Sequence, residues 1–404
     1  MTTLISFAAL FLSIALVQLG SGALAPLDAL SGAALGFSTA EIGLLGSAHY
    51  VGFFAGCWAT PRMMARVGHS RTFGALAAVG AIGALLHPVI VDPLAWSVMR
   101  MATGVAVAGA YTVVESWLHA KAANHERGRI FGVFRMVDLV AQLGAQGLIA
   151  VLEPAAFVSY NIIALFCCLC VLPLLLSNSA APVAEGSPAL RPWRTVLLSP
   201  LGAATSVVAG LTAASFRMVG PIYGAEVGLS PKGIAAFLAA AVLGGAVAQL
   251  PVGWLSDRID RRKVLTGLAF AAIAVCGLGA FDMMAGGLVF VFAFLFGAAA
   301  FPLYSIGAAH ANDFAPPGFV VDLNASLMFL FGVGAIVSPV LAAGIIAAFG
   351  PGALFVYVAI AHVALLAFGL WRMTRRPAAP RTPYVYLPRT SFTLARLMRR
   401  APED

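Results

Sequence analysis

Charged residues are scarce in this chain. Asp, Glu, Lys and Arg make up 10% of the 404 residues, whereas hydrophobic residues make up 61% and the mean hydropathy is +0.95. Ordinary soluble domains contain about 25% charged residues, because polar side chains must cover their surface. The scarcity therefore excludes a soluble enzyme, a disordered chain and a coiled coil. It predicts a helical protein that crosses a membrane many times.

Cysteines and the motifs of enzyme chemistry are also scarce. The five cysteines all lie in apolar stretches, and Cys167, Cys168 and Cys170 lack the paired spacing and the neighbouring histidine of a zinc site. The sequence contains no phosphate-binding Gly-Lys-Ser loop, no His-Glu-x-x-His zinc motif and no nucleophile elbow. We therefore expect no metal, no cofactor and no enzymatic activity, and we do not expect ATP bound by this chain to supply energy.

Apolar stretches of about 20 residues, the length of a membrane-spanning helix, follow one another along the chain. Pro, Gly or a charged residue marks most of the boundaries between them. The pattern predicts an all-α integral membrane protein with twelve transmembrane helices. The predicted spans are residues 5–26, 41–61, 72–91, 94–118, 128–151, 155–176, 196–222, 232–254, 264–282, 286–309, 322–347 and 351–371.

The distribution of positive charge predicts the orientation in the membrane. Arg100, Arg135 and Arg217 lie within spans and Lys232 lies in an odd-numbered loop, whereas the other Lys and Arg residues lie in even-numbered loops or in the C-terminal tail. Cytoplasmic loops carry an excess of Lys and Arg. We therefore expect both termini in the cytoplasm and the chain in the cell inner (plasma) membrane. The net charge of +8 is explained by this asymmetry, so we expect no nucleic-acid partner.

A polar, proline-rich segment divides the predicted spans into two sets of six. Two matched halves are typical of transporters built from repeats. The basic tail is predicted either to be solvated or to lie on anionic lipid. The expected units are an N-terminal six-helix bundle (1–177), a cytoplasmic linker (178–194), a C-terminal six-helix bundle (195–372) and a basic cytoplasmic tail (373–404).

The loop after the eighth span carries a recognisable motif. From Gly253 it reads Gly-Trp-Leu-Ser-Asp-Arg-Ile-Asp-Arg-Arg-Lys, which resembles the G-x-L-x-D-R-x-G-R-R signature of the major facilitator superfamily. Glycine lets two helices approach closely, and the basic cluster favours the cytoplasmic side. In that family the acidic and basic residues latch helices together across the cytoplasmic face. The resemblance therefore implies a conformational latch formed by Gly253, Asp257, Arg258, Arg261 and Arg262.

The matching loop of the first half keeps part of this motif. Arg66 and Gly68 fit the pattern, but Ala65 stands where the family has an aspartate. The offset of nearly half the chain between the two loops supports an internal repeat. The resemblance extends the latch to Arg66 and Gly68, although the first-half version lacks its acidic partner.

Other stretches resemble the same superfamily. Arg100 and Gly104 in span four match an R-x-x-x-G pattern whose arginine is tied to proton coupling, and residues 112–118 and 309–313 resemble a bacterial YcaD-like branch. The Gly-Pro pair that proton-coupled drug antiporters often carry in span five is missing from residues 143–147. The resemblance implies two six-helix bundles that rock around a central cavity between inward-open and outward-open states.

Ionisable residues inside the spans are the candidates for chemistry, because a charge at the bilayer centre costs about 2.5–3.5 kcal/mol. Arg135, Asp138 and Gln142 form a polar stripe on span five, and Glu115 on span four falls at the depth of Arg135. We predict a buried cluster of Glu115, Arg135 and Asp138, which is either a fixed salt bridge or a proton site. Glu115 is the first candidate for the proton carrier and Asp138 the second, while Arg100 joins the proton-coupling set through the resemblance.

The resemblance also implies that spans one, four, seven and ten line the central cavity. The residues predicted to contact the substrate are Gln18, Tyr111, Gln142, Arg217 and Tyr304. The buried charges sum to a small positive value, which favours an anionic or zwitterionic substrate. An alternative for Arg217 is that it only hydrogen-bonds to helix carbonyl groups.

Together these features favour a secondary active transporter that moves a small organic molecule by alternating access, coupled to protons. The frequency of exporters in the superfamily favours export, whereas the positive cavity and the missing Gly-Pro pair favour a proton-coupled uptake symporter for a small organic anion or zwitterion. A receptor or scaffold would need a soluble domain, and an intramembrane enzyme would need a catalytic constellation that is not seen. We expect a monomer in the lipid bilayer, with the substrate and protons as its partners.

Overall fold

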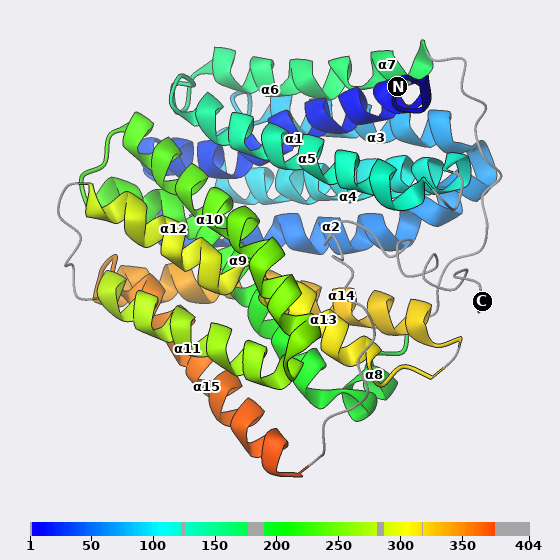
Figure 1. The fold of residues 1–404 in the computed structure, drawn as a ribbon. Coiled ribbons are helices and arrows are strands. Elements are labelled where there is room, and N and C mark those ends of the chain that lie inside the picture. Colours follow the sequence, from blue (N-terminus) through cyan, green and yellow to red (C-terminus); the bar gives the residue numbers. More distant parts are fainter. Residues whose placement is uncertain (1, 123–125, 177–189, 281–286, 317, 376–404) are drawn as a thin grey trace.

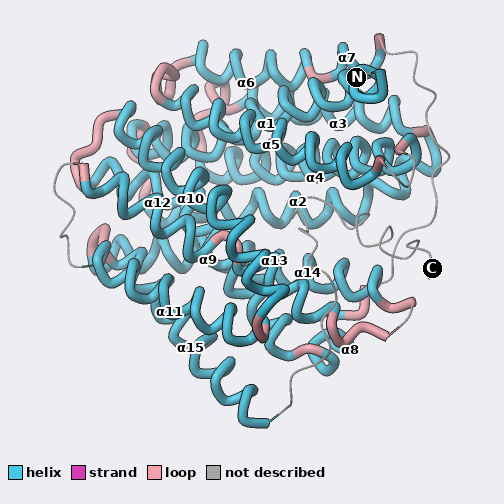
Figure 2. Tube along the Cα trace, in the orientation of Figure 1, coloured by secondary structure: helices cyan, strands magenta, loops and turns pink. Residues whose placement is uncertain are grey.

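The computed structural model describes residues 2–122, 126–176, 190–280, 287–316 and 318–375. Helices make up most of this part of the chain, and it contains no strand (Figure 2). The predicted all-helical architecture is therefore confirmed. In chain order the helices are α1 (Thr2–Ala34), α2 (Thr39–Val67), α3 (His69–Leu86), α4 (Pro93–Lys121), α5 (Arg127–Ile149), α6 (Phe157–Leu169), α7 (Val171–Leu175), α8 (Pro192–Leu198), α9 (Pro200–Glu226), α10 (Pro231–Arg258), α11 (Arg261–Ala280), α12 (Leu288–Ala300), α13 (Leu303–Asn312), α14 (Val320–Phe349) and α15 (Ala353–Arg375).

The helices form two halves that lie side by side. Helices α1 to α7 make up the N-terminal half, at the top of Figure 1, and α8 to α15 make up the C-terminal half below it. Helix α2 packs along α14 and α5 packs along α10, so these two pairs join the halves. The helices of the two halves converge at the left of Figure 1 and diverge towards the right.

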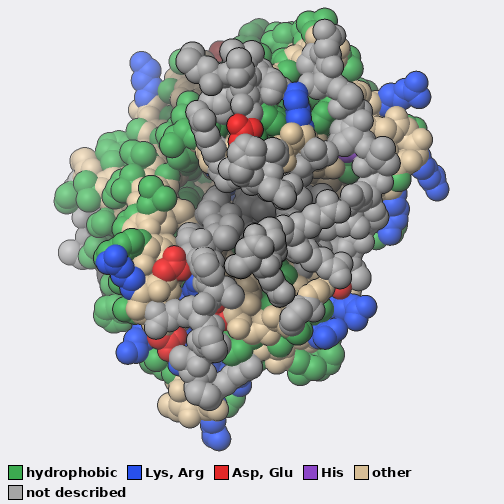
Figure 3. Space-filling model, turned by 45° about the vertical axis from the view of Figure 1, so that its right-hand side comes forward, with side chains coloured by type: hydrophobic (Ala, Val, Ile, Leu, Met, Phe, Trp, Pro, Cys, Tyr) green, Lys and Arg blue, Asp and Glu red, His purple; other side chains and the backbone are tan. Residues whose placement is uncertain are grey.

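The two ends of this bundle differ in charge. One end carries the α2–α3 turn, at the right of Figure 1, and the α10–α11 turn, at its lower centre, with Arg66, Arg71, Arg258 and Arg262. Figure 3 views the molecule from nearer this side and shows Lys and Arg side chains standing at the edges of the face. We name it the basic end and the opposite one the distal end.

Ten stretches of the described chain are long and apolar enough to cross a membrane, with α6–α7 and α12–α13 each counting as one. They match ten of the twelve predicted spans. The other two predicted spans, 72–91 and 128–151, fall on α3 and α5. Helix α3 ends at Leu86 rather than at residue 91 and has only 18 residues. Helix α5 is continuous, but Arg135 and Asp138 make its sequence less apolar.

Some boundaries differ from the sequence-based expectation. The predicted span 286–309 contains a break between α12 and α13, where Pro302 cannot donate a backbone hydrogen bond. Helix α8 begins at Pro192, inside the predicted linker, and residues 178–189 of that linker lie outside the described residues. Helix α15 continues to Arg375, and the predicted tail from residue 376 onward also lies outside them.

Glycines let α2 and α4 pack backbone against backbone. A Cβ atom on Gly52 would lie 1.8 Å from the carbonyl oxygen of Met101, and one on Gly104 would lie 2.1 Å from that of His49. No side chain fits at either position, as is common where small residues join membrane helices. Gly104, which the sequence places in a family motif, therefore forms the contact between α4 and α2.

The two halves also meet through small residues, towards the distal end. A Cβ atom on Gly43 of α2 would lie 2.5 Å from the Cβ atom of Ala343 and 2.6 Å from the carbonyl oxygen of Pro339, both on α14. Beside this contact, Arg217 of α9 donates a hydrogen bond of 3.2 Å from Nη2 to the carbonyl oxygen of Ser21 on α1. These contacts hold the halves together at the distal end.

Replacing Gly104 with alanine is expected to destabilise the protein. The added methyl group would overlap the His49 carbonyl group, and overpacking of this kind costs about 1–3 kcal/mol. Thermal unfolding of the purified protein in detergent should therefore show a lower Tm for Gly104→Ala. Gly132→Ala on α5 is the control, because open space surrounds that glycine and its Tm should stay the same or rise. Equal Tm values for the two variants would contradict the close α2–α4 contact.

Candidate functional site

Four polar side chains from three helices meet inside the N-terminal half. The hydroxyl group of Tyr111 (α4) contacts Gln18 Oε1 (α1) at 2.6 Å and one carboxylate oxygen of Asp138 (α5). Arg135 lies one turn before Asp138 and places Nη1 3.1 Å from the other carboxylate oxygen. We name Gln18, Tyr111, Arg135 and Asp138 the central cluster.

Tyr111 can serve only one of its two acceptors at a time. A phenol carries a single proton, whereas the Asp138 carboxylate and the Gln18 amide oxygen both accept. While Asp138 is ionised, its carboxylate is the stronger acceptor and takes the hydrogen bond. A proton added to Asp138 would leave Tyr111 free to donate to Gln18. The geometry therefore links the protonation state of α5 to a contact between α4 and α1.

The central cluster lies at mid-depth in the bundle. Helix α5 starts at the basic end with Arg127, so Asp138 lies ~16 Å along it, about half of a ~30 Å hydrocarbon layer. The side chain of Asp138 keeps 10% of its exposed surface and that of Arg135 keeps 23%. Gln142, one turn farther along the same helix, is also partly exposed. The ion pair is therefore only partly enclosed by the protein.

Glu115, the first candidate for the proton carrier, is fully buried one turn closer to the basic end than Tyr111. Its carboxylate is near enough to Cys57 of α2 to act on that thiol electrostatically. The structure brings Arg135 and Asp138 together, while the predicted contact between Glu115 and Arg135 stays a prediction. Helix α5 packs mainly along α1 and α10, and Tyr111 is the α4 residue whose contact with Asp138 the structure shows.

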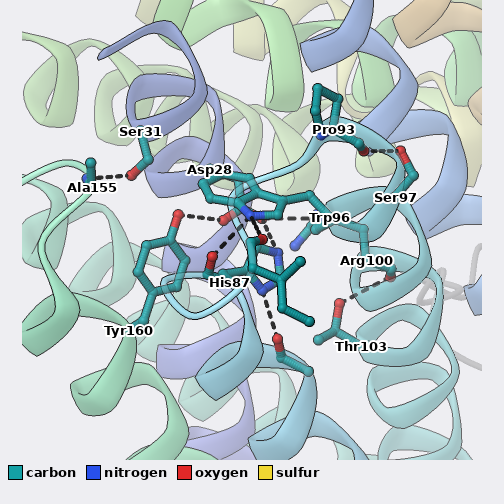
Figure 4. Close-up of polar contacts among 12 residues, drawn as sticks. Asp28, Ser31, His87, Pro93, Trp96, Ser97, Arg100, Thr103, Ala155 and Tyr160 are labelled. Carbon is teal, nitrogen blue, oxygen red and sulfur yellow. Dashed lines mark hydrogen bonds and ion pairs between the residues drawn. The ribbon is translucent and has the colours of Figure 1, made fainter. Parts of the chain in front are cut away.

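A second buried cluster lies nearer the distal end (Figure 4). The carboxylate of Asp28 on α1 lies 3.4 Å from Nε of Arg100 and 3.5 Å from Nε2 of His87. Tyr160 of α6 donates a hydrogen bond of 3.0 Å from its hydroxyl group to Asp28. All four side chains are buried. We name Asp28, His87, Arg100 and Tyr160 the Asp28 cluster.

The imidazole of His87 defines where protons lie in the Asp28 cluster. Its Nδ1 atom is 2.6 Å from the carbonyl oxygen of Gly83, which can only accept, so Nδ1 carries a hydrogen. Nε2 faces Asp28, and this contact is attractive only when a further proton lies on Nε2 or on the carboxylate. Trp96 covers the site and donates from Nε1 to the carbonyl oxygen of His87 at 2.9 Å.

The Asp28 cluster is not predicted from the sequence. The predicted end of span one at residue 26 leaves Asp28 outside the membrane, whereas α1 continues to Ala34 with Pro26 inside it. Arg100, assigned to proton coupling by resemblance, pairs with Asp28. The signal in the sequence was the position of Asp28, which lies only two residues beyond the predicted end of span one. This position could have indicated Asp28 as a partner for Arg100.

The predicted substrate residues Arg217 and Tyr304 belong to the C-terminal half. Arg217 donates to the Ser21 carbonyl group across the boundary between the halves, the kind of contact given above as its alternative. Tyr304 packs against the Phe331 ring, with centroids 5.4 Å apart, and its hydroxyl group lies 3.9 Å from Sδ of Met328. The structure thus places Arg217 between the halves and Tyr304 in the core of one half.

The predicted latch residues of the second half form contacts among three helices of that half. Arg261 of α11 is buried, and its guanidinium group binds Asp257 of α10 at 3.0 Å, Asp313 after α13, and the carbonyl oxygen of Ala309 at 3.1 Å. Gly253 is buried on α10. This network fastens α10, α11 and α13 at the basic end.

The other two arginines of the motif bind close to their own helix ends. The guanidinium group of Arg258 lies 3.8 Å from the centroid of the Trp254 ring. Arg262 binds Asp260 through Nε and Nη2, with a shortest contact of 2.5 Å. These contacts order the α10–α11 turn.

The matching turn of the first half is held in a different way. Gly68 adopts a φ of +82° between α2 and α3, which favours glycine, and Arg66 is exposed. Ala65 offers no carboxylate here, but Nε2 of His69 lies 3.1 Å from the hydroxyl group of Ser116 on α4. A hydrogen bond between side chains therefore ties this turn to its neighbouring helix.

The described residues contain no group of three or more His, Cys, Asp or Glu side chains that could hold a metal ion. What they do contain is two buried carboxylate–guanidinium pairs in the N-terminal half, each extended by a tyrosine. Such an arrangement can bind and release protons and can change partners when helices move.

Comparisons with known proteins identify the family. The Major Facilitator Superfamily model matches residues 202–402. An uncharacterized MFS-type transporter of Enterobacter sp. (strain 638) is 27% identical over 331 residues, which are 81% of this chain and 86% of that protein. The uncharacterized MFS-type transporter YcaD of Salmonella newport (strain SL254) is 26% identical over 328 residues, 80% of this chain and 84% of the relative. The chain belongs to the major facilitator superfamily.

Solved structures of two transporters share the fold. The nucleoside transporter NupG has a TM-score of 0.76 at 14% identity and covers 91% of this chain and 98% of its own. The D-xylose-proton symporter has a TM-score of 0.68 at 14% identity and covers 96% and 99%. At this identity the likeness shows the fold alone. Membership in the superfamily implies transport of small molecules across a membrane rather than catalysis.

Removing one partner of the Asp28–Arg100 pair is expected to destabilise this MFS transporter strongly. Arg100→Gln leaves a buried carboxylate without its counter-charge, and breaking a buried pair costs about 3–5 kcal/mol. Adding Asp28→Asn removes the leftover charge, so the double variant should recover much of the lost Tm. Thermal unfolding of the two single variants and the double variant measures this coupling. Losses of the single variants that simply add in the double variant would show that the pair is uncoupled.

Proposed function

We propose that this MFS transporter moves a small organic anion or zwitterion together with protons, and that Asp138 carries the proton. The observation that supports this assignment is the pairing of Asp138 with Arg135 and Tyr111 at mid-depth, in a place that is buried but not sealed. Ionisable groups inside membrane helices are expensive and are typical of proton pathways.

In this proposal Tyr111 transmits the protonation of Asp138 to α1. With Asp138 ionised, Tyr111 donates to it; with Asp138 protonated, Tyr111 donates to Gln18 at 2.6 Å. The amide oxygen of Gln18 then accepts the hydrogen bond from Tyr111. It is therefore less available to accept a hydrogen bond from a bound substrate. Proton binding and substrate binding are thereby linked through a single hydrogen bond.

The charges favour a negatively charged group on the substrate and co-transport with protons. Arg135 and Arg217 provide two positive charges, and Asp138 is the carboxylate seen beside Arg135. An anion that takes Arg135 leaves Asp138 without its counter-charge, and a proton then neutralises the carboxylate. Substrate and proton bind together in this scheme, which makes the protein a symporter.

The charge asymmetry supports a cytoplasmic position for the basic end in the cell inner membrane. Because the halves pack through Gly43 and Pro339 towards the distal end and diverge towards the basic end, this arrangement corresponds to an inward-facing state (Figure 1). Alternating access would separate the distal contacts and bring the basic ends together.

Proton flux into liposomes tests the proposed function. The purified protein is reconstituted with a trapped pH-sensitive dye, and dicarboxylates, sugar acids and amino acids are added outside in turn. We expect at least one compound to acidify the interior, and Asp138→Asn to lower that rate about ten-fold or more. Asp92→Asn is the matched control and should keep the wild-type rate, because Asp92 only caps α4 and asparagine caps equally well.

Three further results would overturn parts of this proposal. If Glu115→Gln abolishes the flux while Asp138→Asn retains it, the proton carrier is Glu115. If the interior becomes alkaline rather than acidic, substrate and proton move in opposite directions and the protein is an antiporter. If no compound moves protons through the wild-type protein, the coupling ion is not the proton.

A further inference from the structure

A small pocket at the basic end of the C-terminal half gathers hydroxyl and basic side chains. It lies where the start of α9 meets α11, α13 and α15, and its lining includes Ser199, Arg262, His310, Phe314 and Arg372. None of the central-cluster residues lines it. The pocket is therefore distinct from the site proposed for the transported substrate.

Ser199 is a buried polar residue in this lining. It is 1% exposed, and its hydroxyl group has no hydrogen-bond partner among the described residues. It precedes α9 in the N-cap position, yet its side chain makes no capping hydrogen bond. Leaving a buried hydroxyl group unsatisfied costs about 1–3 kcal/mol. A ligand that hydrogen-bonds to it would recover this cost.

The start of α9 adds a second attraction for an anion. The helix has 27 residues, and Pro200 occupies its first turn. The backbone N–H groups of a first turn have no partners within the helix, and the helix dipole places partial positive charge there. Helix N-termini with a neighbouring hydroxyl group are suited to phosphate oxygens.

The two arginines of the pocket differ in how their charge is offset. Burial would raise the pKa of Asp260, but hydrogen bonds from Arg262 outweigh this effect and hold the pKa below its usual value. Asp260 is therefore ionised and offsets the charge of Arg262. Arg372 has no acidic partner among the described residues, and its guanidinium group lies 5.8 Å from the Trp371 ring centroid. Arg372 therefore leaves the pocket positively charged.

We propose that this pocket binds a phosphate group, held by the Ser199 hydroxyl group, the first turn of α9 and the guanidinium group of Arg372. The small size of the pocket suits one phosphate group. Trp193 and Trp371 are exposed at the same end, as is typical of aromatic residues at the level of lipid headgroups. The phosphate can come from an anionic phospholipid or from inorganic phosphate in solution, and the two sources are distinguished by experiment.

Thermal unfolding of the full-length protein in detergent tests the site with two probes. Phosphatidylglycerol in mixed micelles represents the lipid, inorganic phosphate represents the free anion, and diacylglycerol is the phosphate-free control. A ligand that binds the folded state raises Tm in proportion to the logarithm of its concentration over Kd. We expect at least one phosphate-bearing probe to raise Tm, and diacylglycerol to leave it unchanged.

Variants tie this binding to the pocket. Ser199→Ala and Arg372→Gln should each raise the Kd of the active probe about ten-fold, since each removes a hydrogen bond to a charged group. Arg375→Gln is the matched control, because it removes the same charge from the end of the same helix but does not line the pocket. The Tm of each variant without ligand shows that it is folded.

The outcomes separate the sources and decide the proposal. Binding of phosphatidylglycerol alone that depends on Ser199 and Arg372 identifies a lipid site, and binding of inorganic phosphate with the same dependence identifies an anion site. The proposal is overturned if neither probe raises Tm. It is also overturned if Ser199→Ala keeps the wild-type Kd, or if Arg375→Gln weakens binding as much as Arg372→Gln does.

Discussion

A charge buried inside an apolar helix bundle needs a partner within reach, and the N-terminal half is arranged around this requirement. Asp28 binds Arg100, and Asp138 binds Arg135. The first pair, with the rest of the Asp28 cluster, ties α1 and α4 to α6 and to the end of α3. The central cluster draws α5 onto the same two helices. Because separating α1 from α4 would leave Asp28 and Arg100 as uncompensated charges, and Tyr111 links α4 to α1 and α5, these helices are held in a fixed relation and can move as one body.

The interface between the two halves, called the seam below, is held by weaker contacts than the ion pairs within the N-terminal half. Arg261 fastens α10, α11 and α13 within the C-terminal half, so both halves are held internally by ion pairs. Across the seam, small residues such as Gly43 pack against α14, and Arg217 makes a hydrogen bond to the backbone of Ser21. Such contacts cost less to separate than a buried ion pair. Rigid halves and a separable seam are what a rocking transporter needs.

The sequence predicts the features that depend on composition and periodicity, namely the helical architecture and ten of the twelve expected apolar spans. The ion pair of Arg135 with Asp138 is also readable, because the two residues are one turn apart on one helix. The pairing of Arg100 with Asp28 could not be predicted from the sequence. It depends on how α1 packs against α4 and on the extension of α1 beyond its apolar stretch. For the same reason, periodicity alone did not show that Tyr111 would reach Asp138.

Infrared difference spectroscopy of the purified protein between high and low pH tests the role of Asp138 most directly. The predicted result is a carbonyl band of a protonated carboxylic acid that appears at low pH, is lost in Asp138→Asn and persists in Glu115→Gln. In Tyr111→Phe the same band should shift in frequency, because the protonated carboxyl group loses the phenol oxygen to which it donates. A band that is lost in Glu115→Gln but persists in Asp138→Asn would contradict the assignment of Asp138 as the proton carrier.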